Sequence, residues 1–272
     1  MVILTAMAIS ASIGIASEHG GSRIPDGVIY ADTFTVRDER PPFTAQGRYA
    51  GQAMIDERPE VNRSGRQASF QGTQVGLLYL ARGENSGVND GAESGVIERV
   101  PRGWFNAQAM VPIPEELKRM RVSLDVNAGE LGEVVPGSNN WTNIGIVLSN
   151  SRETGWYESE HLFRTGLARV KGNDNQVRTA IRMEERRVDN TFHILDTDTE
   201  AFDTTIWHNI QVDINLDTGH VRVLLNGEKV GETRLSQETA SNLSYVGLDA
   251  HTRLEGDTLI SSQFDNFYVL PF

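Results

Sequence analysis

Hydrophobic and polar residues alternate along residues 204–232. From Ile210 to Leu216 the apolar side chains take every second position, which is the period of a β-strand with one buried face. A turn signal at 217–219 ends this strand, and the alternation resumes from Val221 to Leu225. Asn226-Gly227 then supplies the residue pair that best tolerates positive φ in a tight hairpin. This stretch therefore predicts three antiparallel strands.

Shorter alternating or apolar runs predict further strands, at 28–36, 68–72, 75–81, 104–113, 120–128, 142–150, 166–172, 177–185 and 191–196. Residues 37–66 are rich in Arg, Pro, Gly and Gln, and we expect them to be irregular. The only expected helical turn is 114–120, which begins with Pro114. Short strands separated by turn signals indicate an all-β chain, an antiparallel two-sheet β-sandwich of the jelly-roll type.

Composition and charge narrow the choice of partners. A chain of 272 residues with 26 glycines suits one large β-domain, which we place at 28–272. The net charge of −12 argues against nucleic acid, because phosphate binding needs a clustered cationic surface. The densest basic run holds Arg178, Arg182, Arg186 and Arg187. We expect these arginines to be solvent-exposed on a strand and paired with Glu184 and Glu185.

The first residues carry a different pattern. Residues 1–16 are apolar and small, and Gly14-Ile15-Ala16 before Ser17 forms a small-x-small cleavage pattern. We interpret them as a signal peptide followed by a linker at 17–27, which predicts a secreted or cell-surface protein, extracellular or periplasmic. Because no Lys or Arg precedes Arg23, a buried first strand and a misassigned start codon stay open as alternatives. No later segment is apolar enough for a membrane helix, so we expect no integral membrane segment in the mature chain.

Four stretches, in their order, resemble the concanavalin A-like lectin/glucanase superfamily, and within it the laminin-G-like domains of bacterial secreted proteins. They are ADTF (31–34), GQAMIDERPEVN (51–62), WHNIQVDINLDTGHVRVLLNGEKVG (207–231) and FDNFYV (264–269). The resemblance covers residues 28–272 and implies a concanavalin A-like jelly roll. This superfamily includes glycoside hydrolases, polysaccharide lyases and non-catalytic glycan-binding modules.

The catalytic motifs of the enzymes in this superfamily are incomplete here. A retaining glycosidase needs two carboxyl groups about 5 Å apart, which alternating acids on one strand provide. The nearest run places Glu158 and Glu160 before His161 and lacks the intervening acid, so a solvent-facing pair is the favoured interpretation. The single histidines suit surface or turn positions, and the resemblance gives His208 a structural role. The absence of cysteine also excludes catalytic thiols and thiolate metal sites.

The leading interpretation is an exported, non-catalytic module that binds a carbohydrate or a cell-surface polymer. Aromatic rings can stack on the C–H face of a sugar, and amides can hydrogen-bond its hydroxyls. The candidate ligand-binding residues are Trp141, Trp156, Tyr157, Asn139, Asn140 and Asn143. Core packing is the alternative role for the aromatic residues. A structural or adhesive assembly protein and a divergent polysaccharide hydrolase or lyase stay open as alternative functions, and the sequence does not specify the oligomeric state.

The resemblance also implies a structural calcium ion. Members of the glucanase branch hold calcium with an Asp of the closing strand and carbonyls near the start of the chain. Asp32 in ADTF and Asp265 in FDNF match these places. The alternative is that Asp265 accepts backbone N–H hydrogen bonds at a strand end. A weaker second candidate is Asp196, Asp198 and Glu200, which we expect in a solvated loop.

Overall fold

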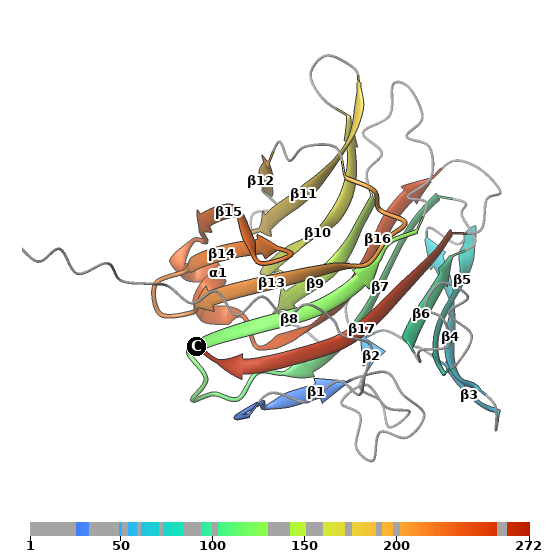
Figure 1. Ribbon diagram of the computed structural model, residues 1–272, viewed down its shortest axis with the longest axis horizontal. Helices are drawn as coiled ribbons and strands as arrows, with labels where there is room; N and C mark the ends of the chain where they lie inside the picture. Colours follow the sequence, from blue (N-terminus) through green and yellow to red (C-terminus); the bar gives the residue numbers. More distant parts are fainter. Residues whose placement is uncertain are drawn as a thin grey trace, which may run out of the picture.

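The computed structural model describes residues 26–32, 49–50, 54–58, 61–70, 73–83, 94–99, 103–129, 142–150, 160–171, 176–188, 192–197, 202–254 and 260–272. These residues form two antiparallel sheets and one short helix (Figure 1). The predicted all-β sandwich is thus confirmed. The signal peptide at 1–16 and most of the linker at 17–27 lie outside the described residues and stay predictions. The laminin-G-like assignment stays a prediction as well.

Sheet A contains ten strands. Their bounds are β1 (Tyr30–Asp32), β3 (Met54–Arg58), β4 (Val61–Phe70), β5 (Thr73–Gly83), β6 (Ser94–Arg99), β8 (Arg119–Asn127), β13 (His208–Asn215), β14 (His220–Leu225), β15 (Glu228–Arg234) and β17 (Ile260–Pro271). Their order is β15-β14-β13-β8-β17-β6-β5-β4-β3, with β1 paired to β17. The first and last strands therefore lie side by side, as the resemblance implied.

Sheet B contains seven strands in the order β12-β11-β10-β9-β16-β7-β2. Their bounds are β2 (Tyr49–Ala50), β7 (Gly103–Pro112), β9 (Thr142–Ser149), β10 (Leu162–Lys171), β11 (Val177–Arg186), β12 (Phe192–Thr197) and β16 (Tyr245–Leu254). Sheet B lies behind sheet A in Figure 1, with the helix α1 (Gln237–Asn242) at one end of the sandwich.

The core fills the space between the two sheets. Sheet A contributes alternate residues of its strands, including Val122, Leu124, Ile210, Val212, Val221 and Val223. Phe264 and Phe267 of β17 both join the core because the register of this strand shifts between Asp265 and Tyr268. Sheet B contributes Ile144, Ile146, Phe163, Leu167, Ile181, Met183, Val246 and Leu248. Because side chains alternate between the faces of a strand, the intervening positions lie on the outer face of each sheet.

The hairpins predicted at 204–232 are confirmed. The strands β13, β14 and β15 pair antiparallel in sequence order. Gly219 has φ +71° in the first turn, and Asn226 and Gly227 have φ values of 52° and 84° in the second. Two consecutive positive φ values are typical of the tight hairpin turn that Asn-Gly favours.

Two features of the β14–β15 pair characterise the edge of sheet A, which we call its rim. The strand β15 is the last of sheet A among the described residues, and most of its side chains are exposed. Its register with β14 shifts between Val223 and Leu224, which marks a β-bulge or irregularity.

The sequence misplaced several elements. Residues 37–66, expected to be irregular, contain β2, β3 and the start of β4. The strands β3 and β4 pair antiparallel, with Met54 opposite Gly65 and Arg58 opposite Val61. The expected helical turn at 114–120 is instead a tight turn, in which Leu117 N donates to Pro114 O, and β8 begins at Arg119. The strands β6 and β16 and the helix α1 were not predicted.

The helix α1 begins at a cap that Ser236 provides. The Ser236 hydroxyl accepts a hydrogen bond from Thr239 N over 3.1 Å, which satisfies one of the N–H groups left open at a helix start. Six residues are too few to display a helical hydrophobic period, so the sequence pattern does not indicate this helix.

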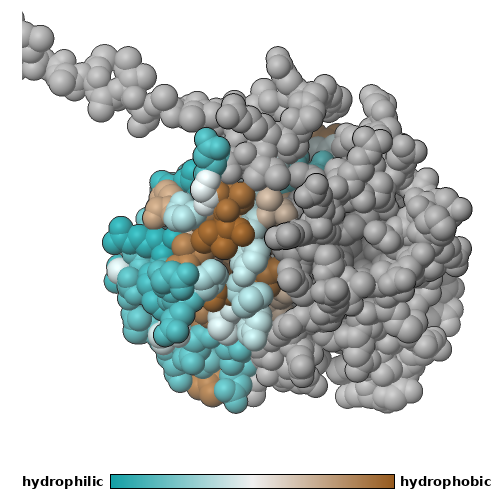
Figure 2. All heavy atoms as spheres, turned by 90° about the horizontal axis from the view of Figure 1, so that it is seen from below, coloured by the Kyte–Doolittle hydropathy of each residue, from teal (hydrophilic) through white to brown (hydrophobic). Residues whose placement is uncertain are grey.

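Seen from below, the described surface is polar around a central apolar area (Figure 2). The large apolar side chains that are exposed in the described part are Ile29, Val188, Ile206 and Phe272. In the same part of the chain, no helix has the length and apolar character needed to cross a membrane.

Candidate functional site

Charged side chains are buried on the outer face of sheet B. Outer positions of β10 and β11 hold Arg164, Arg182 and Glu184, whose exposed fractions are only 1%, 6% and 2%. Asp249 of β16 is fully buried as well. Charged groups are almost never buried in this way unless they are paired, so their contacts define a candidate site.

Arg164 is the centre of these contacts. Its Nε and Nη2 donate hydrogen bonds to Glu184 Oε2 at 2.8 and 2.7 Å. Its Nη1 lies 3.9 Å from Asp249 Oδ2. Arg182 Nη2 lies 3.8 Å from the other oxygen of Glu184, Oε1. We call Arg164, Arg182, Glu184 and Asp249 the Arg164 network.

Two glycines form the backbone between the ends of the network. Gly145 of β9 pairs with both Gly166 of β10 and Asp249, and Gly166 pairs with Arg182. A Cβ on either glycine would collide with a carbonyl oxygen of the neighbouring strand, that of Thr165 or of Ile144. The line from Arg182 to Asp249 therefore carries no intervening side chain.

The network is costly to the fold. Burial lowers the pKa of the Arg164 guanidinium, and the charges of Glu184 and Asp249 oppose that shift. Buried ion pairs usually stabilise a protein no more than apolar side chains of the same size. Stability alone thus gives no reason for four charged residues on this face.

Glu185, the next residue along β11, serves the fold instead. Its Oε1 accepts a hydrogen bond from Ser236 N at 2.8 Å, and its Oε2 accepts one from Arg187 Nη2 at 2.9 Å. Burial acts to raise the pKa of Glu185, but hydrogen bonds from Arg187, Ser236 and Thr239 outweigh it and the pKa falls. Glu185 thereby ties β11 to the start of α1. His161 Nδ1 lies 3.4 Å from Thr239 Oγ1 at the same helix.

His208 has the structural role that the resemblance implied. Its Nδ1 lies 3.0 Å from Asn226 Nδ2, and its Nε2 lies 2.6 Å from Asp203 O. An amide nitrogen can only donate, so Nδ1 accepts and Nε2 carries the proton that it donates to the carbonyl. His161 is buried at the bend before β10, so a surface location is wrong for this histidine.

Most of the predicted sugar-binding residues lie outside the described residues, namely Trp141, Trp156, Tyr157, Asn139 and Asn140. Asn143 is in β9, where its backbone pairs with Ala168 and His251, and its side chain is outside the description. Of the two acids considered for catalysis, Glu160 is exposed, as a solvent-facing residue should be, and Glu158 is outside the described ranges.

The predicted calcium residues come near each other through the β1–β17 pairing. Asp32 lies opposite Phe267 in that pair, and Asp265 lies opposite Asp125 of β8. Asp265 Oδ1 accepts a hydrogen bond from Asn266 N at 2.7 Å. In the described part of the chain no three His, Asp or Glu side chains are grouped to hold a metal ion, and the Asp32 side chain is not described. The calcium ion therefore stays a prediction.

The structure also locates part of the second calcium candidate. Asp196 lies in the strand β12, where its backbone is opposite Arg182 of β11, so the expectation of a loop is wrong for this residue. Asp198 and Glu200 lie outside the described residues.

Sequence reasoning missed Arg164 and Asp249 altogether. It expected the arginines of the basic run to be solvent-exposed, which is correct for Arg178 and wrong for Arg182 and Arg186, because these two are buried. The expected pairing with the two glutamates does occur, for Arg182 with Glu184 and for Arg187 with Glu185. The available signal was a charged residue at every second position of β11 from Arg182 to Arg186, which are its outer positions.

No protein-family model and no curated protein sequence matches the chain. Several solved structures match this chain at low sequence identity. LamAcat from Zobellia galactanivorans is 12% identical, with 90% of this chain and 98% of that chain covered and a TM-score of 0.48. An alginate lyase with a bound alginate trisaccharide is also 12% identical, with 72% and 84% covered and a TM-score of 0.47. The binding domain of botulinum neurotoxin DC, in complex with rat synaptotagmin II, is 11% identical, with 82% and 42% covered and a TM-score of 0.38.

Proposed function

We propose that this chain is an exported, non-catalytic module that binds a polysaccharide at the outer face of sheet B. The Arg164 network carries the proposal. It fixes two guanidinium groups and two carboxylates on the sheet face that does not pack into the sandwich core. Binding sites typically combine a few well-placed polar groups held rigidly by their neighbours.

Guanidinium N–H groups donate hydrogen bonds and carboxylate oxygens accept them, so the four members of the network hold one another in fixed positions. The network is buried in this structure, so its role in binding is to order the strands and side chains under the ligand. The predicted aromatic residues Trp141, Trp156 and Tyr157 supply the stacking surface in this proposal.

The contacts of the two carboxylates favour binding over hydrolysis. A general acid must hold a proton ready for the leaving group. Glu184 Oε2 instead accepts two hydrogen bonds from Arg164, and Asp249 lies against the same guanidinium. Neither group is arranged to deliver a proton to a glycosidic oxygen.

The test is retention on a panel of immobilised neutral and acidic polysaccharides, with Asp249→Asn as the variant. Asparagine has the shape of the aspartate side chain but no charge, so we expect this variant to bind polysaccharide about tenfold more weakly. Asp217→Asn, in an exposed turn, is the control and should bind normally. Retention on no polysaccharide would contradict the proposal.

The alternative functions give different results in the same experiment. Release of reducing sugars or unsaturated products, abolished by Glu158→Gln or Glu160→Gln, would identify a hydrolase or lyase. An assembly protein would form oligomers and bind no polysaccharide. Export predicts that the mature protein begins at Ser17, which mass spectrometry of the secreted chain measures.

A further inference from the structure

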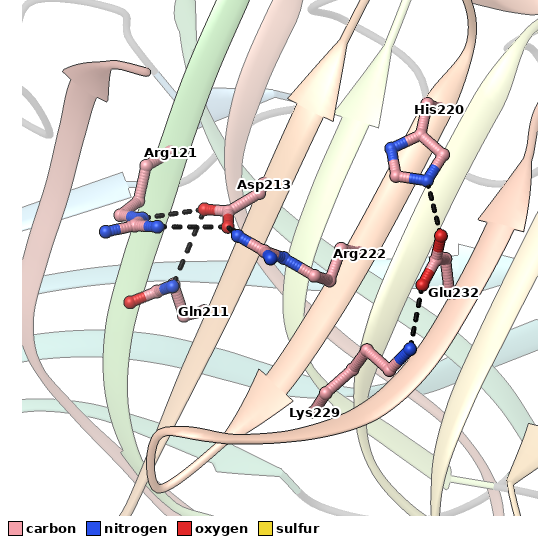
Figure 3. A network of polar contacts seen from close by, with 7 residues as sticks. All are labelled: Arg121, Gln211, Asp213, His220, Arg222, Lys229 and Glu232. Atoms are coloured by element: carbon pink, nitrogen blue, oxygen red, sulfur yellow. Dashed lines mark hydrogen bonds and ion pairs between the residues drawn. The ribbon is translucent and has the colours of Figure 1, made fainter. Parts of the chain in front are cut away.

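We propose a second binding site, for a polysaccharide that carries carboxylate groups, on the outer face of sheet A. Arg121 and Arg222 surround the buried Asp213 (Figure 3), and the ring of Phe272 lies against both guanidinium groups. The site lies on the opposite sheet from the Arg164 network and does not depend on the function proposed there.

Asp213 holds the two arginines in place from the middle of a row across three strands. It pairs with Arg121 of β8 on one side and with Arg222 of β14 on the other. Arg121 Nε and Nη2 donate to its two oxygens at 2.6 and 3.0 Å. Arg222 Nε donates to Oδ2 at 3.1 Å, and Arg222 Nη2 donates to the same oxygen. Since Asp213 is only 2% exposed, both guanidinium groups are fixed by a buried anion.

The two arginines retain donors for a ligand. Their side chains are 35% and 37% exposed. The contacts described for them with Asp213 use Nε and Nη2, which leaves each Nη1 for another partner. One carboxylate is shared by two guanidinium groups, so the cluster keeps a positive charge. Planar carboxylates are the ligands that guanidinium forks match best.

Phe272 adds an apolar surface to this charge. Its ring centre lies 4.9 Å from Arg121 Cζ and 5.7 Å from Arg222 Cζ, and the residue is 55% exposed. An exposed aromatic ring offers a platform for the C–H face of a sugar. The combination of ring and fork therefore favours a uronic acid residue over an acidic peptide.

The surroundings attract a polyanion although the whole chain is acidic. Two adjacent rows of cross-strand partners run over the outer face of β8, β13, β14 and β15. The first row is Arg119–Asn215–His220–Arg234 and the second is Arg121–Asp213–Arg222–Glu232. They contain four arginines and two carboxylates, whereas the chain has a net charge of −12. Such a local field draws an anionic polymer to this face.

The test compares binding to polygalacturonate and to its methyl ester, which keeps the sugar backbone and removes the charge. We expect the protein to bind polygalacturonate and the ester much more weakly. Arg121→Gln/Arg222→Gln should weaken polygalacturonate binding about tenfold or more, because two charge-assisted contacts are lost. Lys118→Gln removes one positive charge from an exposed residue outside the two rows and should change binding little.

Phe272→Ala keeps both arginines and the fold, and should weaken binding to polygalacturonate while leaving any binding to polyglutamate unchanged. Equal binding of the methyl ester, or wild-type affinity in the double arginine variant, would overturn the proposal. Equally tight binding of polyglutamate would also overturn it, by indicating a general anion surface. Binding of neutral polysaccharides reports on the sheet B site, so failure of one proposal leaves the other testable.

Discussion

Arg164 and Glu184 are direct cross-strand partners, and a single oxygen of the glutamate accepts both hydrogen bonds from the guanidinium. Arg164→Met removes the main counter-charge of a buried carboxylate. We therefore expect the free energy of unfolding to fall by about 3–5 kcal/mol, measured by urea denaturation. Arg164→Met/Glu184→Leu removes the uncompensated charge and should recover part of that loss. A double variant as unstable as the single one would contradict this account.

Asn226 joins the β14–β15 turn to the start of β13. Its side-chain oxygen accepts a hydrogen bond from Asn209 N at 2.9 Å, and its amide nitrogen contacts His208. Asn226→Gly keeps the freedom to adopt a φ of 52° and loses both contacts, which should cost about 1–2 kcal/mol. Asn226→Ala also strains the backbone, so it should cost about 1 kcal/mol more. Equal melting temperatures for the two variants would show that backbone strain is negligible here.

The sequence predicts the parts of the fold in which one face of a strand is apolar. This holds for β13 and β14, where Val212 and Val223 alternate with polar residues and the core lies on one side only. It fails for β16, although Val246 and Leu248 alternate with Gly247 and the buried Asp249, because the apolar face continues only with the small Ala250 and the polar Thr252. It also fails for β3 and β4, whose largely polar sequences conceal a backbone pairing.

The sequence does not predict the candidate site either, and the reason is different. Arg164 and Asp249 are far apart in the sequence and meet because β10, β9 and β16 are neighbours in sheet B. No local pattern encodes that order of strands. The alternating charges of β11 were visible, but an outer strand face is normally solvated, so its burial around Arg182 and Glu184 was not expected.

Glu232 provides a test of the charges on the outer face of sheet A. Lys229 Nζ and His220 Nε2 lie 2.9 and 2.7 Å from its oxygens, and hydrogen bonds from these residues lower the pKa of Glu232 from 4.5 to about 2 (Figure 3). Because the folded-state pKa is depressed, the stabilising contribution is present above pH 4.5 and is lost as the pH falls towards 2. Lys229→Gln should raise the pKa of Glu232 in a carboxyl NMR titration, whereas Lys118→Gln should not.

The predicted calcium ion is tested by thermal unfolding with calcium and with chelator. We expect calcium to raise the melting temperature and Asp265→Ala to abolish the increment, because a metal that binds only the folded state stabilises it. Asp217→Ala, in an exposed turn, should retain the increment. Identical melting curves with calcium and with chelator would leave Asp265 with its hydrogen bond from Asn266 N as its role.

The rim of sheet A at β15 bears on how the protein behaves at high concentration. An extended strand at the side of a sheet is a template on which another chain can add, and this is how amyloid-like growth begins. Glu228, Lys229, Glu232 and Arg234 place charge along β15, and the shifted register at Val223 and Leu224 disturbs its regularity. Both features oppose the addition of a further strand. Sheet A is thus protected on this side against fibre formation, and replacing these charges with β-branched apolar residues would remove that protection.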